Sequence, residues 1–94
     1  MLSDHDQAVD RLKQLAVELE SRSFAVRLLT RPDQPPCLRV INPAAPVLSE
    51  HVLVAPNSDG EWWFCFPWPQ RIAVTDDVTA AADRIEHVLA EVDR

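Results

Sequence analysis

Glycine and tyrosine are almost missing from this 94-residue chain: Gly60 is the only glycine, and tyrosine does not occur. A phosphate-binding loop needs several glycines whose main chain wraps around the anion, and no such segment is present. Ser49 also lacks the flanking glycines of a nucleophilic serine in hydrolases. We therefore expect no enzymatic activity and no cofactor.

Long apolar runs are absent too, since none approaches the roughly 18 residues of a membrane-spanning helix. The first residues, Met1 to Asp6, are polar and acidic. A signal peptide would instead begin with basic residues followed by an apolar segment. We expect a cytoplasmic protein with no membrane association, in which residues 1–94 form a single domain.

Positive charge is scarce: 9 lysines and arginines stand against 15 aspartates and glutamates, which gives a net charge of −6. Lys13 is the only lysine. Proteins that bind nucleic acids or anionic membranes generally present a basic contact surface. The acidic balance predicts that neither is a partner.

Cysteine and histidine are few, and Cys37, Cys65, His5, His51 and His87 show none of the short spacings of a metal site or redox pair. If the two cysteines lie on the second and fourth strands of a meander, they are about 9.6 Å apart. That separation is too long for a disulfide bond. We expect free thiols and no bound metal. One hypothesis for the function is an enzyme that uses His51 or Cys65, and it is weaker than the hypothesis of a binding protein.

Aromatic residues are concentrated in the stretch Glu61–Pro69, which holds all three tryptophans and two of the three phenylalanines. Because aromatic side chains bury large areas, this stretch is either a central strand or a binding surface. Pro67 and Pro69 end the strand and hold Trp68 between them. Trp68 is interpreted either as a lid on the core or as an interface anchor beside Arg71.

Helical periodicity marks both ends of the chain. Apolar residues recur at spacings of three and four over residues 8–19 and again over residues 78–92. Each segment has one apolar stripe, with acidic residues mostly off it, so each is predicted to pack on a sheet. The expected helix caps are Ser3 or Asp4 for the first helix and Asp76 or Thr75 for the second.

Between the helices the apolar period changes to two, which is typical of strands. The predicted strands are residues 24–30, 37–42 and 49–55 and the aromatic run, and Asp59-Gly60 indicates a hairpin before that run. Residues 71–74 connect to the last helix and can add a short edge segment. The sequence thus predicts an α+β fold of order α-β-β-β-β-α, a four-stranded antiparallel meander with two helices on one face.

The aromatic strand is apolar on both faces, although two helices cover only one face of such a sheet. With a hairpin loop over residues 57–60, Val54 lies across from Trp63 and Val52 across from Cys65. This arrangement predicts an apolar patch opposite the helices, which a second copy covers in a homodimer. Which face the helices cover stays open at this point. The predicted interface comprises Val52, Val54, Trp63 and Cys65, with Arg39 and Glu50 at its rim.

Four segments resemble a group of small actinobacterial proteins of unknown function. These segments are Leu38–Pro43, Gly60–Phe64, Arg71–Ala73 and Ala80–Ile85. The similarity covers roughly residues 12–92, and members often have further tryptophans where this chain has Cys65 and Phe66. The resemblance implies no catalytic residues. In element order and acidity the chain is also similar to small dimeric secretion-chaperone-like proteins, which is an analogy of fold alone.

Together these patterns predict a small homodimer that binds a protein or peptide in a chaperone- or regulator-like role. The alternative is a small-molecule-binding domain with an aromatic-lined cleft at Trp62, Trp68 and Arg71. His51, on the strand that precedes the aromatic run, completes the predicted set of ligand- or partner-binding residues.

Overall fold

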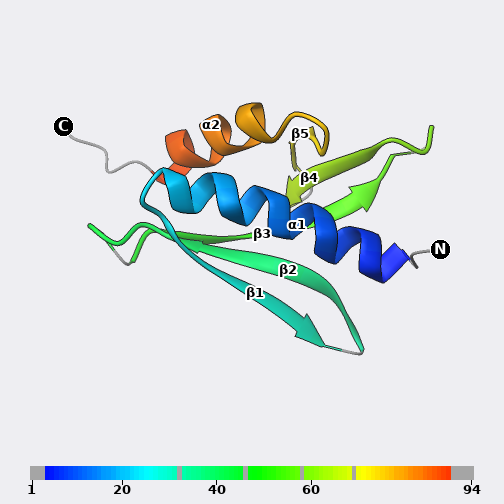
Figure 1. The fold of residues 1–94 in the computed structure, drawn as a ribbon, viewed down its shortest axis with the longest axis horizontal. Helices are drawn as coiled ribbons and strands as arrows, with labels where there is room; N and C mark the ends of the chain where they lie inside the picture. The colour runs from blue at the N-terminus through cyan, green and yellow to red at the C-terminus, as the bar shows by residue number, and fades with distance from the viewer. Residues whose placement is uncertain (1–3, 32, 46, 58, 69, 90–94) are drawn as a thin grey trace.

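The computed structural model describes residues 4–31, 33–45, 47–57, 59–68 and 70–89. Two helices flank five antiparallel strands, so the predicted α+β fold with an antiparallel sheet is confirmed (Figure 1). The predicted number of four strands is wrong. The elements are α1 (Asp4–Ser21), β1 (Ala25–Arg31), β2 (Gln34–Ile41), β3 (Ser49–Pro56), β4 (Trp62–Phe66), β5 (Gln70–Val74) and α2 (Val78–Leu89).

The additional strand, β5, pairs with β4 and carries one extra residue, a β-bulge. Phe64 pairs with Ala73 and Cys65 pairs with Arg71, so Ile72 is the residue without a partner. Ile72 and its neighbour Ala73 are both buried. The bulge therefore removes the period-two alternation that would have identified this segment as a strand.

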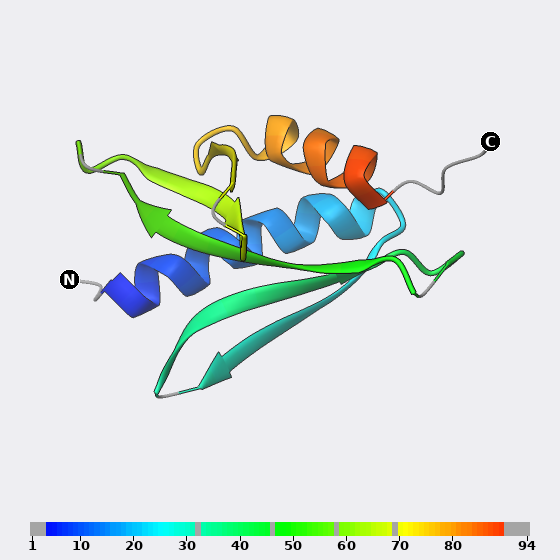
Figure 2. The ribbon, with the colours of Figure 1, turned by 180° about the vertical axis from the view of Figure 1, so that it is seen from behind.

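The sheet is a meander in which the strands lie in the order β1-β2-β3-β4-β5. β3 changes partners along its length. Its first half, residues 49–52, pairs with β2, and its second half, residues 53–56, pairs with β4. Beyond this point the β1–β2 hairpin and the β3–β4 hairpin diverge, as both views show (Figures 1 and 2).

Both helices cover the same face of the sheet. α1 lies across β1, β2 and β3, and α2 packs beside α1 and against β5 (Figure 1). The core between these layers is apolar, as the helical stripes and the strand alternation require. Its largest fully buried side chains are Phe64, Phe66, Leu12, Leu15, Leu19, Leu38, Ile85, Val40 and Val52.

The end of α1 is a Schellman motif built without glycine. The Ser23 amide donates to the Glu20 carbonyl at 3.0 Å, and the Phe24 amide donates to the Leu19 carbonyl at 3.1 Å. These two bonds require a left-handed residue after the helix, and Ser23 has a φ of 72°. Glycine adopts this conformation more readily than serine, so the turn is held at some conformational cost.

The cap of α2 is Asp77, not Asp76 or Thr75 as the sequence predicted. Asp77 Oδ1 accepts a hydrogen bond from the Ala80 amide at 3.0 Å. Thr75 is buried instead, and its amide donates to the Trp62 carbonyl at 3.0 Å. The main chain continues the β4–β5 ladder through Thr75, which delays the start of the helix.

Polar contacts also hold α2 in place. Arg22, which follows α1, forms ion pairs with Glu18 of α1 and with Asp83 and Glu86 of α2. These carboxylates raise the pKa of the Arg22 guanidinium above its ordinary value. At the C-terminal end of α2, Asn42 Nδ2 donates to the Leu89 carbonyl at 2.9 Å, which satisfies one carbonyl of the last turn.

The pairing of β3 with β4 differs by one residue from the predicted register. Val54 pairs with Phe64 and Ala55 pairs with Trp63, because Pro56 pairs with Trp62 and the loop therefore spans residues 57–61. A slip of one residue moves every side chain of a strand to the other face. Val52 and Val54 consequently lie on the helix-covered face, where Val52 is fully buried and Val54 packs against the core.

Candidate functional site

The face of the sheet opposite the helices, called the open face below, has no layer of secondary structure on it among the described residues (Figures 1 and 2). Paired residues on neighbouring strands share a face, so the register assigns its members. The open face comprises Ala25, Arg27, Leu29, Arg31, Gln34, Cys37, Arg39, Ile41, Ser49, His51, Leu53, Ala55, Trp63, Cys65, Arg71 and Val74.

Basic side chains form a row across three strands of the open face. Arg27 pairs with Arg39, and Arg39 pairs with His51, so the three lie side by side. All three are exposed. Like charges directly opposite each other destabilise a sheet. Neither Arg27 nor Arg39 forms an ion pair with any residue that the structure describes, so this repulsion has no local compensation.

Charge is separated between the two sides of the molecule. Among the described positions of the open face there is no aspartate or glutamate. The ion pairs of the described residues lie on the helix side of the molecule. They join Arg22 to Glu18 of α1 and to Asp83 and Glu86 of α2, and Arg11 of α1 to Asp76 before α2. The charges that sum to −6 are thus unevenly distributed over the surface, and an anion that approaches the open face meets basic side chains.

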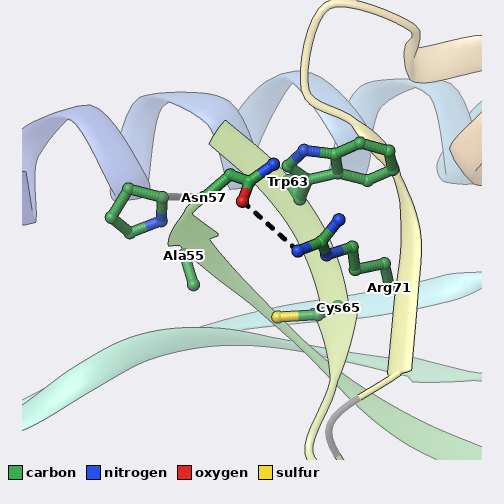
Figure 3. A pocket seen from close by; sticks show the side chains of 6 residues that line it. Ala55, Asn57, Trp63, Cys65 and Arg71 are labelled. Carbon is green, nitrogen blue, oxygen red and sulfur yellow. Dashed lines mark hydrogen bonds between the residues drawn. The ribbon is translucent and has the colours of Figure 1, made fainter. Parts of the chain in front are cut away.

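A pocket of about 300 Å³ lies on the open face near the loop between β3 and β4. Figure 3 shows how its side chains come together. Arg71 Cζ lies 5.1 Å from the centre of the Trp63 ring, within cation–π range. Arg71 Nη2 donates to Asn57 Oδ1 at 3.3 Å. The pocket is lined by Ala55, Pro56, Asn57, Trp63, Cys65 and Arg71.

The bulge in β5 directs Arg71 into this pocket. With strict alternation, Arg71 would share a face with Ala73, which pairs with the buried Phe64. The extra residue Ile72 instead turns Arg71 to the open face, opposite Cys65. β-bulges commonly re-aim a side chain in this way.

Two further features distinguish the pocket. The indole N–H of Trp63 is buried and has no hydrogen-bond partner among the described residues, which carries a desolvation cost of about 1–3 kcal/mol. Burial raises the pKa of the Cys65 thiol, and the nearby Arg71 charge partly offsets this rise. Burial alone raises the pKa of Cys37. Cys37 and Cys65 are both free.

Two other hollows lie outside this pocket. One, of about 260 Å³, is at the divergence of the two hairpins and is lined by His5 and Ala8 of α1 together with Pro35, Pro36, Val54, Pro56 and Trp62. The other, of about 270 Å³, is on the open face at the end of the β1–β2 hairpin. Its lining residues are Leu29, Arg31, Gln34, Pro35, Cys37 and His51.

The ligand-binding residues predicted from the sequence do not gather into one cleft. Trp62 faces the hollow beside α1, whereas Arg71 and His51 lie on the open face. Trp68 stacks on Phe66 with the ring centres 4.7 Å apart, and its Nε1 donates to Gln70 at 3.1 Å. At 44% exposure, Trp68 is attached to the edge of the core and not enclosed by it.

The predicted interface is divided between the two faces. Arg39, Trp63 and Cys65 lie on the open face, as expected for that patch. Glu50 pairs with Val40 and therefore lies on the helix-covered face, together with Val52 and Val54. Ala55, Pro56 and Asn57, which also line the pocket, were not among the predicted site residues. The five-residue loop that places them has no distinctive signal, because Asp59-Gly60 is compatible with several loop lengths.

Comparisons with protein-family models, with curated proteins and with solved structures give no match to this chain. Within the described ranges, no group of three or more His, Cys, Asp or Glu side chains could hold a metal ion. Neither described helix is long and apolar enough to cross a membrane. The residues of the open face are thus the basis for assigning a function.

Proposed function

We propose that this domain binds an acidic segment of a partner protein on its open face. The observation that carries the proposal is the row of Arg27, Arg39 and His51, with Arg71 further along the sheet, on a face with no carboxylate among its described positions. Without a partner, Arg27 and Arg39 repel each other. Carboxylates from a bound segment would turn this repulsion into attraction.

The apolar residues between the arginines support a protein partner. Leu29 is 40% exposed, and Leu53 and Trp63 are partly exposed on the same face. Interface centres are enriched in tryptophan and arginine, and they combine such residues with aliphatic side chains. A segment that carries both acidic and apolar residues would complement this surface.

The same charges disfavour a homodimer that joins two open faces, which is the contact predicted from the sequence. A twofold contact places a surface against its own copy. Arg27 and Arg39 would then be brought close to the same two arginines of the second copy, and the register leaves Val52 and Val54 on the other side of the sheet. We therefore propose a different protein as the partner.

Nucleic acid is a less suitable anionic partner for this face. Single-stranded nucleic acid is held mainly by bases that stack on aromatic rings along a basic groove. Trp63 is the only aromatic residue among the described positions of the open face, and the Arg71 guanidinium already lies over its ring. The open face therefore lacks the series of aromatic rings that successive stacked bases need.

The proposal is tested by titrating the domain with a short peptide of aspartate, glutamate and leucine, followed by amide chemical shifts. A peptide with lysine in place of each acidic residue is the control ligand. We expect the acidic peptide to shift open-face amides, and Arg39→Glu to weaken binding by about tenfold or more. Arg84→Glu is the matched control, because Arg84 is exposed on α2, and it should leave the affinity nearly unchanged.

Three results would contradict the proposal. One is a set of shifts confined to the helices, and another is equal binding of the lysine peptide. The third is tighter binding of a single-stranded oligonucleotide of the same charge, which would make nucleic acid the better candidate.

A further inference from the structure

We infer that the pocket beside Trp63 and Arg71 binds the C-terminal residue of the partner polypeptide, with Arg71 holding its carboxylate. This inference rests on the proposed function, and it names the part of the partner that is held. The pocket lies on β3, β4 and β5 of the open face, whereas the row of Arg27, Arg39 and His51 lies on β1, β2 and β3.

The orientation of Arg71 is fixed from two sides. Arg71 Cζ lies over the Trp63 ring, 5.1 Å from its centre, and Asn57 Oδ1 accepts one guanidinium N–H at 3.3 Å. A guanidinium has five N–H donors in a rigid fork, which matches the two oxygens of a carboxylate. Arg71 forms no ion pair with any described residue, so the remaining donors are available for an anion.

The rest of the pocket is apolar. Ala55, Pro56, Trp63 and Cys65 supply most of its lining, and Arg71 supplies its single charge. An aspartate or glutamate side chain would place a carboxylate near Arg71 but has little apolar surface for this lining. A C-terminal leucine, valine or phenylalanine supplies both groups on one residue, and capture of terminal carboxylates is a recurring mode of peptide recognition.

The size of the pocket also favours one residue over a free small molecule. Its volume of about 300 Å³ is at the lower limit of the roughly 300–1,000 Å³ typical of small-molecule sites. It opens onto the same surface as the arginine row. A chain whose last residue enters the pocket can therefore continue across Leu53 toward Arg39 and Arg27.

The test is a double-mutant cycle between the peptide terminus and Arg71. Two versions of an acidic peptide that ends in leucine, one with a free carboxylate and one with a terminal amide, are titrated into the domain by calorimetry. For the original domain, we expect the amide to bind about tenfold more weakly, which corresponds to loss of one charge-assisted contact. For Arg71→Met, the two peptides should bind equally.

Matched variants separate recognition of the terminus from general charge effects. Arg27→Met should weaken both peptides and keep the tenfold ratio, because Arg27 lies away from the pocket. Arg71→Lys keeps the charge but loses the planar fork, so we expect an intermediate ratio. Melting of each variant, followed by circular dichroism, verifies that it is folded.

Each contrary result is distinguishable. Equal binding of both peptides to the original domain would overturn the inference and leave the proposed function in place. A tenfold ratio that persists in Arg71→Met would also overturn it, since another group would then hold the terminus. N-acetyl-leucine that binds as tightly as the whole peptide would indicate a small-molecule site and overturn it as well. If neither peptide binds, the proposed function and the inference both fail.

Discussion

The two faces of the sheet consist of the same five strands, yet they carry different side chains. The face beneath the helices presents Val26, Leu28, Leu38, Val40, Val52, Val54 and Phe64 to the core. The open face alternates arginine and histidine with partly exposed apolar residues. The hydrophobic effect explains the first set, because folding removes these apolar side chains from water. The second set is not explained by folding, because Arg27 and Arg39 oppose sheet formation.

The largest expected difference between the faces is in the cost of truncating a leucine. Leu38→Ala, on the covered face, removes a fully buried side chain and should lower the free energy of unfolding by about 2–5 kcal/mol. Leu53→Ala, on the open face, should cost less than about 1 kcal/mol, because Leu53 is partly exposed. Urea denaturation measures both values. Equal costs would show that the open face is covered in solution.

The covered face also depends on how firmly α2 is held. Asp77→Ala removes the acceptor of the Ala80 amide and should lower the free energy of unfolding by about 1 kcal/mol. Asp76→Ala is the matched control and should change it by less than about 0.5 kcal/mol. Asp76 is highly exposed, and its contact with Arg11 is a surface ion pair. The reverse order of effects would mean that Asp76 is the cap after all.

A charge reversal on the open face should improve folding while it harms binding. Arg27→Glu places a carboxylate opposite Arg39 and should raise the free energy of unfolding by about 0.2–1 kcal/mol. The gain should shrink in high salt, which screens exposed charges. The same variant should bind the acidic peptide more weakly. A variant that loses stability at low salt would contradict the proposed repulsion between Arg27 and Arg39.

The smallest effect concerns the two thiols, whose pKa values are both raised by burial. At a pH just above the ordinary pKa of a cysteine thiol, both cysteines should react with iodoacetamide more slowly in the folded domain than in urea. The reason is that the raised pKa leaves less thiolate in the folded state. Arg71→Met should raise the pKa of Cys65 further and leave Cys37 unchanged, since only Cys65 is near the Arg71 charge. Mass spectrometry of each labelled cysteine across pH measures both values. An equal change at the two thiols would place Arg71 elsewhere.

The sequence predicts the helices and most strands because their apolar residues are buried in the pattern that the periodicity indicates. The stripe from Ala8 to Leu19 is buried as expected at Ala8, Leu12, Leu15 and Leu19. The face assignment fails for a local reason. The loop contains one additional residue, Glu61, which shifts the register of β3 against β4 by one residue and so exchanges the two faces of β3. The alternation of β3 is ambiguous, because Val52, Leu53 and Val54 are all apolar and suit either face. The register therefore depends on loop conformation, which composition does not determine.

The candidate site was predictable only in part, for a similar reason. Trp63, Cys65 and Arg39 follow from alternation along single strands. The stack of Arg71 on Trp63 depends on the bulge at Ile72, and the Asn57 contact depends on the loop. Both features arise from pairing between strands and carry no signal within one segment of sequence.

The change of partner along β3 has a consequence for hydrogen exchange. The β1–β2 hairpin is joined to the rest of the sheet through the four residue pairs between β2 and the first half of β3. α1 packs on β1, β2 and β3, whereas α2 packs on β5 and on α1. Sub-global opening of a native protein follows such divisions. We expect amides of β1 and β2 to exchange together through an opening that leaves β4, β5 and the Arg71 pocket closed, so protection on the two sides of β3 should fall at different denaturant concentrations.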